Sequence, residues 1–369
     1  MTDGISARGQ DSDLDLESLA SEEADAEAGP IRYELFTFPA DFTLEVLHQK
    51  WKNGEILIPP MQRGFVWSQF QASRLIESFL LGLPVPSIFF YVERGTEKYL
   101  VVDGQQRLRS IFYFLEGSFG EEKFGKRIVF RLTLPDGALS QPNAWNGKMF
   151  SDLREEDALK LKNSILRAFI MKQVLPDDDT SIYHVFERLN TGGTSLTPQE
   201  VRNAVYGGPF NEMLHRLNEG EDWRAILGRP KPDQRLKDIE LILRFLALYK
   251  AGDKYEKPMK SFLTDFMRDH KLGQLNRELE PVFVKATDAV KKSLGARPFH
   301  LRAGLNAPVF DAVFVAFADH PEELPKDIGA RYQRLLADAD FAKWTGRATT
   351  DVEAVKQRIV LARKYLFKE

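Results

Sequence analysis

The residues best suited to chemistry in this sequence lie in one short stretch, YLVVDGQQRLRS, which runs from Tyr99 to Ser110. Its β-branched beginning is typical of a strand, and the residues from about Gln105 to Leu115 have helical spacing. Asp103-Gly104 turns the chain between them. A first helical turn offers backbone N–H groups and the positive end of the helix dipole. The stretch therefore predicts a turn that binds phosphate or another anion.

Each side chain of this turn has a candidate role. Gly104 lets the backbone turn and lets a ligand approach closely. Arg107 projects from the same turn, and its planar guanidinium matches phosphate oxygens. Asp103 stands at the carboxyl end of the strand, where it is a candidate ligand for a divalent metal that bridges phosphates, or a base. Gln105 and Gln106 are candidates for orienting a water or reading a ligand edge.

A purely structural interpretation of the same residues stays open. Asp-Gly is an ordinary turn, and aspartate is an ordinary N-cap, so a strand, a turn and a capped helix need no ligand. Local physics alone does not decide between the two interpretations.

A second stretch, PPMQRGFVW, runs from Pro59 to Trp67 and carries Gln62 and Arg63. One interpretation places an amide and an arginine in the wall of a binding site. The other is a loop packed on the core through Phe65 and Trp67. The spacing favours neither.

A third stretch, VFERLNTGGTSLTPQEVRNA, contains Asn190 in a sharp Asn-Thr-Gly-Gly turn after a helix. Thr197 and Pro198 are typical of the start of the next helix. A well-capped connector between two helices explains the pattern, and so does a polar cluster of Glu187, Arg188 and Asn190 that faces the same site.

Around these stretches the hydrophobic pattern predicts a mixture of strands and helices in the N-terminal part, and helices alone in the C-terminal part. Thr43 and Ser68 are expected N-caps, and Gly82 is an expected helix end. A hairpin is expected from the two strands on either side of Gly95. The expected strands are 56–58, 87–93, 98–102, 128–134 and 169–174, and the expected helices are 43–51, 68–82, 105–115 and most of the chain from 181 onward, with 238–249 the clearest.

Composition limits the class of protein. The 369 residues are 43% hydrophobic and 28% charged, as in a soluble globular protein, and no apolar run reaches 18 residues. The chain lacks cysteine, which excludes disulfides, thiolate zinc sites and cysteine nucleophiles. With no secretory signal at its start, the chain is expected in the cytoplasm, with no membrane partner.

Charge and periodicity divide the chain into three parts. Residues 1–30 hold nine acidic residues and one basic residue, which predicts a disordered acidic tail. Residues 31–207 are expected to form a mixed α/β domain, and residues 208–369 a helical domain. The fold class expected is therefore α+β, a small mixed sheet with helices followed by an all-helical part. Beyond the tail, the excess of 50 basic over 45 acidic residues permits a DNA surface without requiring one.

Taken in order, the three stretches resemble the N-terminal domain family of the GmrSD modification-dependent restriction endonucleases, whose fold is similar to the ParB/sulfiredoxin nucleotide-binding domains. The segments LIESFLLGLPVPSIFF, RLKDIELILRFLAL and KSFLTDFM extend the resemblance over roughly residues 40–270. Any one motif is weak, whereas the ordered set is specific. Sulfiredoxin chemistry is not implied, because it needs a cysteine.

The resemblance implies a nucleoside triphosphate site, hydrolysis of that nucleotide with Mg²⁺, and a link to DNA and a nuclease. Position by position, it implies catalytic roles for Asp103, Gln105, Gln106 and Arg107, nucleotide-binding roles for Gln62, Arg63, Gly104, Arg107 and Asn190, and a metal-binding role for Asp103.

Full-length relatives add an HNH nuclease, which needs a histidine base and further metal ligands. In this chain the candidate segment for such a histidine is Asp319-His320-Pro321, but its pattern predicts a helix start with Pro321 at the first helical position. We therefore expect no nuclease activity from this chain alone. The sequence favours a nucleotide-binding regulatory or sensor protein of a restriction or anti-phage system, an NTPase acting with a separate effector nuclease. The alternative is a non-catalytic module that binds DNA or a DNA modification.

Overall fold

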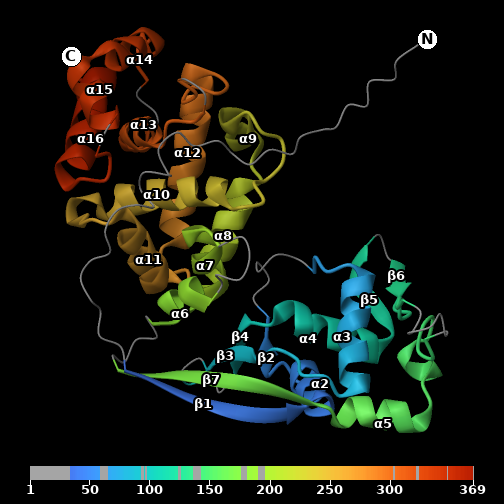
Figure 1. The fold of residues 1–369 in the computed structure, drawn as a ribbon. Coiled ribbons are helices and arrows are strands. Elements are labelled where there is room, and N and C mark those ends of the chain that lie inside the picture. The colour runs from blue at the N-terminus through green and yellow to red at the C-terminus, as the bar shows by residue number, and fades with distance from the viewer. Residues whose placement is uncertain are drawn as a thin grey trace, which may run out of the picture. The chain divides into compact units, whose positions relative to one another are not determined.

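The computed structural model describes residues 34–58, 65–92, 95, 98–123, 126–135, 143–175, 181–189, 196–301, 304–320, 324–346 and 348–368. The described chain forms two compact units, Arg32–Ser195 and Leu196–Glu369 (Figure 1). The sequence predicts a domain boundary at residue 207, whereas one structural unit gives way to the other after Ser195. The two positions lie on either side of one short helix, Pro198–Val205. The acidic tail expected for residues 1–30 lies outside the described residues.

Five strands form the main sheet of the first unit, in the order β1-β7-β3-β4-β2. They are β1 (Glu34–Thr43), β2 (Ile56–Leu57), β3 (Ile88–Val92), β4 (Tyr99–Asp103) and β7 (Ile165–Leu175). β1 pairs antiparallel with β7, and β3 with β4. β7 pairs parallel with β3, and β2 with β4. The predicted mixed sheet and the predicted hairpin of β3 and β4 are thus confirmed.

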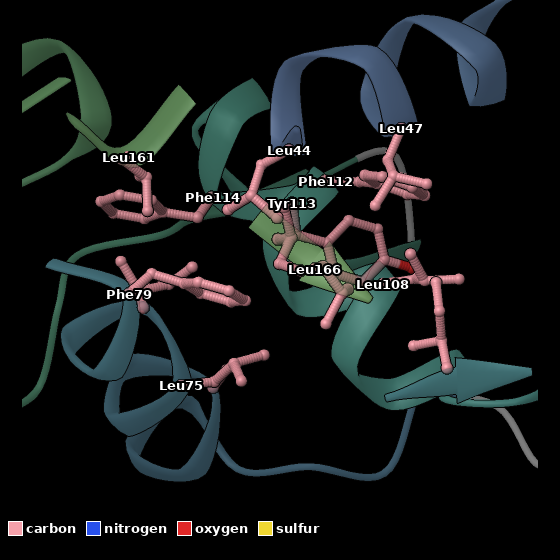
Figure 2. Close-up of a cluster of buried hydrophobic side chains, with 14 of the residues drawn as sticks. Leu44, Leu47, Leu75, Phe79, Leu108, Phe112, Tyr113, Phe114, Leu161 and Leu166 are labelled. Carbon is pink, nitrogen blue, oxygen red and sulfur yellow. The ribbon is translucent and has the colours of Figure 1, made fainter. Parts of the chain in front are cut away.

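Four helices and the sheet build one apolar core in this unit (Figure 2). The helices are α2 (Leu44–Lys52), α3 (Gln69–Leu81), α4 (Gln105–Glu116) and α5 (Glu155–Asn163). In β7, Leu166, Ala168 and Ile170 are buried while Arg167 between them is exposed, because successive side chains of a strand point to opposite faces. The hydrophobic pattern therefore fixes which face of the sheet meets the helices.

The ends of these helices follow the predicted capping signals. Thr43 accepts a hydrogen bond from the Val46 N–H at the start of α2. Ser68 and Gln71 form a reciprocal capping box at the start of α3, and Gly82 ends that helix at a φ of 76°. These caps satisfy backbone groups that helix ends leave unpaired, so the boundaries could be predicted from local sequence alone.

Helix α4, which follows the DGQQR turn, is anchored along its length. Phe112 is fully buried and stacks on Trp51 of α2, with ring centroids 4.7 Å apart. At the far end, the His48 Nε2 lies 3.2 Å from Glu116 Oε1. Burial lowers the pKa of His48, with the Glu116 hydrogen bond opposing it. These contacts fix the C-terminal half of α4 against α2.

Two expectations about strands need correction. The long strand β1 was missed, because all but three of its residues are exposed and it lacks a run of buried apolar positions. The strand expected at 128–134 is shorter: β6 (Lys126–Val129) pairs with β5 (Ser118–Lys123) in a separate sheet. Beyond it, Leu132 bonds to the loop instead, donating to Lys148 O and accepting from Gly147 N. Leu132 is buried, as a strand residue of the core would be, which is why the hydrophobic pattern of the sequence predicts a strand there.

The remaining elements are helical, as predicted. A 3₁₀ turn (Phe150–Asp152) and α6 (Ser181–Leu189) belong to the first unit. The second unit contains α7 (Pro198–Val205), α8 (Pro209–Asn218), α9 (Glu221–Leu227), α10 (Lys237–Ala251), a 3₁₀ turn (Gly252–Lys254), α11 (Met259–His270), α12 (Asn276–Leu294), α13 (Ala307–Asp319), α14 (Ile328–Ala337), α15 (Ala339–Gly346) and α16 (Val352–Phe367). Over the described ranges, no helix has the length and apolar character needed to cross a membrane.

His320 does not begin a helix, contrary to the sequence-based expectation. It is the C-cap of α13, and its ring stacks on Phe367 with centroids 4.8 Å apart. The neighbouring Asp319 accepts a hydrogen bond from Arg363 Nε at 2.7 Å. Pro321, which suggested the helix start, lies outside the described residues. Both side chains at this position therefore hold α16 to α13.

Candidate functional site

The DGQQR turn lies where β4 passes into α4. β4 ends at Asp103, Gly104 is the N-cap residue, and α4 begins at Gln105. Gly104 has a φ of 96° and makes no side-chain cap bond. The alternative in which Asp103 caps the helix is therefore wrong. The aspartate is available for another partner at the positive end of the helix dipole.

That partner is Arg107, one helical turn further on. Arg107 Nη2 donates to Asp103 Oδ2 at 2.7 Å and to the Ser87 carbonyl oxygen at 3.1 Å. The Asp103 side chain is 41% exposed and that of Arg107 is 17% exposed. The Arg107 Nε is buried and has no hydrogen-bond partner among the described residues. One guanidinium thus joins the end of β4, the residue before β3 and the first turn of α4.

Gly104 is required here by packing as well as by its backbone angle. A Cβ at this position would lie 2.3 Å from Ile88 Cγ2, which is closer than side chains can approach. The close approach of a ligand to Gly104 stays a prediction. On the side where a Cβ would point, the space is already filled by Ile88 of β3.

Replacing Gly104 with alanine should destabilise the protein more than replacing Gly82. Both glycines have a positive φ, where a Cβ costs about 1–2 kcal/mol. Only the Cβ at Gly104 meets a neighbour, since nothing lies within 4 Å of one at Gly82. Overpacking adds about 1–3 kcal/mol, so urea titrations should separate the two variants by that amount. Equal losses of stability would contradict the close contact with Ile88.

The two glutamines of the motif lie in different surroundings. Gln105 is buried, with 7% of its surface exposed. The Gln106 Oε1 accepts hydrogen bonds from the backbone N–H groups of Val66 and Trp67, at 3.1 and 3.3 Å. Of the four residues to which the sequence assigns catalytic roles, the structure pairs Asp103 with Arg107 and uses Gln106 to hold another segment of the chain.

Gln62, Arg63 and Asn190 lie outside the described residues, but sheet topology constrains where the second motif begins. β2 runs parallel to β4, with Ile56 opposite Tyr99 and Leu57 opposite Leu100. The carboxyl ends of parallel strands meet at one edge of a sheet. β2 therefore runs toward the edge where Asp103 ends β4, and its pairing stops opposite Leu100, three residues before Asp103.

Sequence reasoning missed the contributions of Ser87 and Ile88 to this site. They reach it through the antiparallel pairing of β3 with β4, in which Phe89 lies opposite Asp103. A register shift follows immediately, between Phe89 and Phe90. The hairpin was predictable, but its register was not, so no local signal identified these two residues.

A Mg²⁺ ion that arrives with a nucleotide fits the carboxylate available here. The Asp103 side chain is 41% exposed, and Arg107 engages its Oδ2. Magnesium typically takes one or two carboxylates together with phosphate oxygens and waters. Within the described ranges, no cluster of three or more histidine, cysteine or acidic residues forms a metal site by itself. Asp103 would thus share the ion with phosphates.

The fold and the turn define an α+β domain whose sheet edge presents an aspartate–arginine pair at a helix start. Residues 44–207 match the family described as the GmrSD restriction endonuclease N-terminal domain. This is the family that the motifs resemble, so the sequence-based identification of this segment is confirmed. The match associates the segment with restriction systems.

The chain is also similar to the uncharacterized protein MJ0686 of Methanocaldococcus jannaschii. The two are 22% identical over 231 residues, which cover 42% of this chain and 40% of that protein. The chain thus spans less than half the length of the curated relative, whose name states no activity.

Proposed function

We propose that the first unit binds a nucleoside triphosphate at the turn formed by Asp103, Gly104 and Arg107. The whole protein would then act as a regulatory or sensor NTPase of a restriction or anti-phage system, together with DNA and a separate effector nuclease. The observation that carries the proposal is the position of Arg107. Its guanidinium lies at the start of α4, bonded to a half-exposed carboxylate that a phosphate can replace as its partner.

Exchange of partners is the physical basis of this binding. Without nucleotide, Arg107 and Asp103 neutralise each other at 2.7 Å. A phosphate group offers more acceptor oxygens in the geometry that a guanidinium prefers, at the positive end of the α4 dipole. If Arg107 turns to the phosphate, Asp103 is left free to take the Mg²⁺ that accompanies it. Both charges then contribute to nucleotide binding.

Hydrolysis would join a water oxygen to the γ-phosphorus and break its bond to the β-phosphate, releasing a nucleoside diphosphate and inorganic phosphate. A bound Mg²⁺ would supply charge stabilisation for the phosphate oxygens. Asp103 is the candidate to hold that ion, and Arg107 the candidate to neutralise the transferred group. Gln62, Arg63 and Asn190 are supporting candidates for contacts to the nucleotide.

One observation favours the second candidate function, a module that binds DNA or a DNA modification without catalysis. The ion pair of Asp103 with Arg107 also makes a stable structural link between β4 and α4. If no ligand displaces it, the turn is a support for a binding surface. Nucleotide hydrolysis separates the two functions, because only the first requires Asp103 as a free carboxylate.

Replacing Asp103 with asparagine should suppress nucleotide hydrolysis on the order of 100-fold and leave metal-free nucleotide binding nearly unchanged. The amide keeps the shape of the side chain but loses the charge that holds Mg²⁺. Phosphate release and metal-free titration measure the two effects. Asp41→Asn is a matched control, since Asp41 is also 41% exposed and also paired with an arginine, Arg167. Equal, measurable rates for wild type and Asp103→Asn would contradict the metal-binding role of Asp103, whereas absence of hydrolysis by wild type would favour the binding module.

A further inference from the structure

The side chain of Gln106 is bonded to a segment that lies 40 positions earlier in the chain. Its Oε1 accepts from the Val66 N–H at 3.1 Å and from the Trp67 N–H at 3.3 Å. Both donors are backbone groups, so the accepting atom has to be the amide oxygen. The main chain of Gln106 is fixed as well, because its carbonyl accepts from Ser110 Oγ at 2.7 Å. Gln106 thus connects the first turn of α4 to the last residues of the second motif.

Aromatic packing holds the same segment next to these hydrogen bonds. Phe65 and Trp67 are partly buried against the apolar core of the unit. The Phe65 ring packs in a T-shaped arrangement with the Tyr113 ring of α4, at a centroid distance of 5.1 Å, and with the Phe119 ring, at a centroid distance of 5.3 Å. Packing fixes where the aromatic side chains lie. The Gln106 bonds fix the backbone between them.

The other end of the second motif is also anchored near the turn. Ile58, just after β2, packs on the same apolar core. β2 is parallel to β4 and its last residue, Leu57, lies opposite Leu100, so Ile58 continues in the direction in which β4 runs to Asp103. The chain is therefore held in the first unit on both sides of residues 59–64, which lie outside the described residues.

We propose that Gln106 is a positioning residue for the nucleotide site, which acts by holding the segment 65–67 against the DGQQR turn. The proposal rests on the proposed function and gives Gln106 a role different from that of a catalytic amide. A catalytic amide would orient the attacking water through direct contact. A positioning residue needs only an oxygen acceptor for the two backbone N–H groups.

Hydrogen–deuterium exchange tests this role without any nucleotide. In Gln106→Met, which keeps side-chain length but lacks the acceptor, exchange of the Val66 and Trp67 amides should accelerate about tenfold. In Gln106→Glu, whose carboxylate still accepts, exchange should stay close to wild type. Gln49→Met is the matched control, since the Gln49 side chain donates to Asn53 Oδ1, at the end of α2. Unchanged exchange in Gln106→Met would overturn the proposal.

Nucleotide titration then shows whether the held segment matters for binding. Gln106→Met should weaken nucleotide affinity about tenfold. Unchanged affinity in this variant would contradict a positioning role at the nucleotide site. If wild type binds no nucleotide, the proposed function fails, while the exchange experiment still decides whether Gln106 holds residues 65–67.

Discussion

Replacing Asp311 with alanine should lower the free energy of unfolding of the helical unit by about 3–5 kcal/mol. Asp311 of α13 is fully buried and accepts from two arginines, Arg244 of α10 and Arg358 of α16. Arg244 bonds both carboxylate oxygens, from Nε at 3.1 Å and from Nη2 at 2.6 Å. Removing the one carboxylate leaves two guanidiniums buried without their counter-charge.

Thermal and urea unfolding of purified variants measure this effect. Asp311→Asn separates charge from shape, because the amide fills the same space but cannot neutralise two guanidiniums. It should also be strongly destabilising. Asp288→Ala is the control, since Asp288 forms an exposed pair with Lys292 and its removal should leave the melting temperature nearly unchanged. Similar losses for Asp311→Ala and Asp288→Ala would show that the buried network contributes no more than a surface pair.

Arg107→Ala should weaken nucleotide binding by about 2–4 kcal/mol, the usual scale for removing one partner of a hydrogen-bonded charge pair. Arg107→Lys should recover little of this loss. Lysine keeps the charge but lacks the planar fork that reaches both the Ser87 carbonyl and an anion. Arg167→Ala removes an exposed arginine that is paired with Asp41 and should leave nucleotide affinity unchanged.

Much of the fold could be predicted because its signals are local. The caps at Thr43 and Ser68 and the glycine stop at Gly82 are each read from a few neighbouring residues. Strand β1 could not be predicted in this way. It is an edge strand with mostly exposed residues, and its stability comes from pairing with β7, where Asp41 bonds Arg167 across 126 positions. Such pairing leaves no periodic signal in the strand itself.

The candidate site likewise contains residues that local sequence predicts and residues that it does not. Asp103, Gly104 and Arg107 were predicted because a strand, a glycine and a helix follow one another directly in the sequence. The functions of Ser87, Ile88 and Gln106 depend on contacts between segments 16 or more positions apart. Gln106 illustrates the difficulty. The sequence alone does not distinguish a catalytic glutamine from one whose side chain accepts hydrogen bonds from the backbone of another segment. Only the bonds to Val66 and Trp67 distinguish them.

The central claim is that the turn of Asp103 and Arg107 binds a nucleoside triphosphate. Calorimetric titration of a panel of nucleotides into wild type, Arg107→Lys and Arg107→Ala, with and without Mg²⁺ and DNA, tests it most directly. We expect saturable binding to wild type, and a loss of about 30-fold to 1,000-fold in affinity for Arg107→Ala. Absence of nucleotide binding by wild type under all of these conditions would contradict the claim and favour the module that binds DNA.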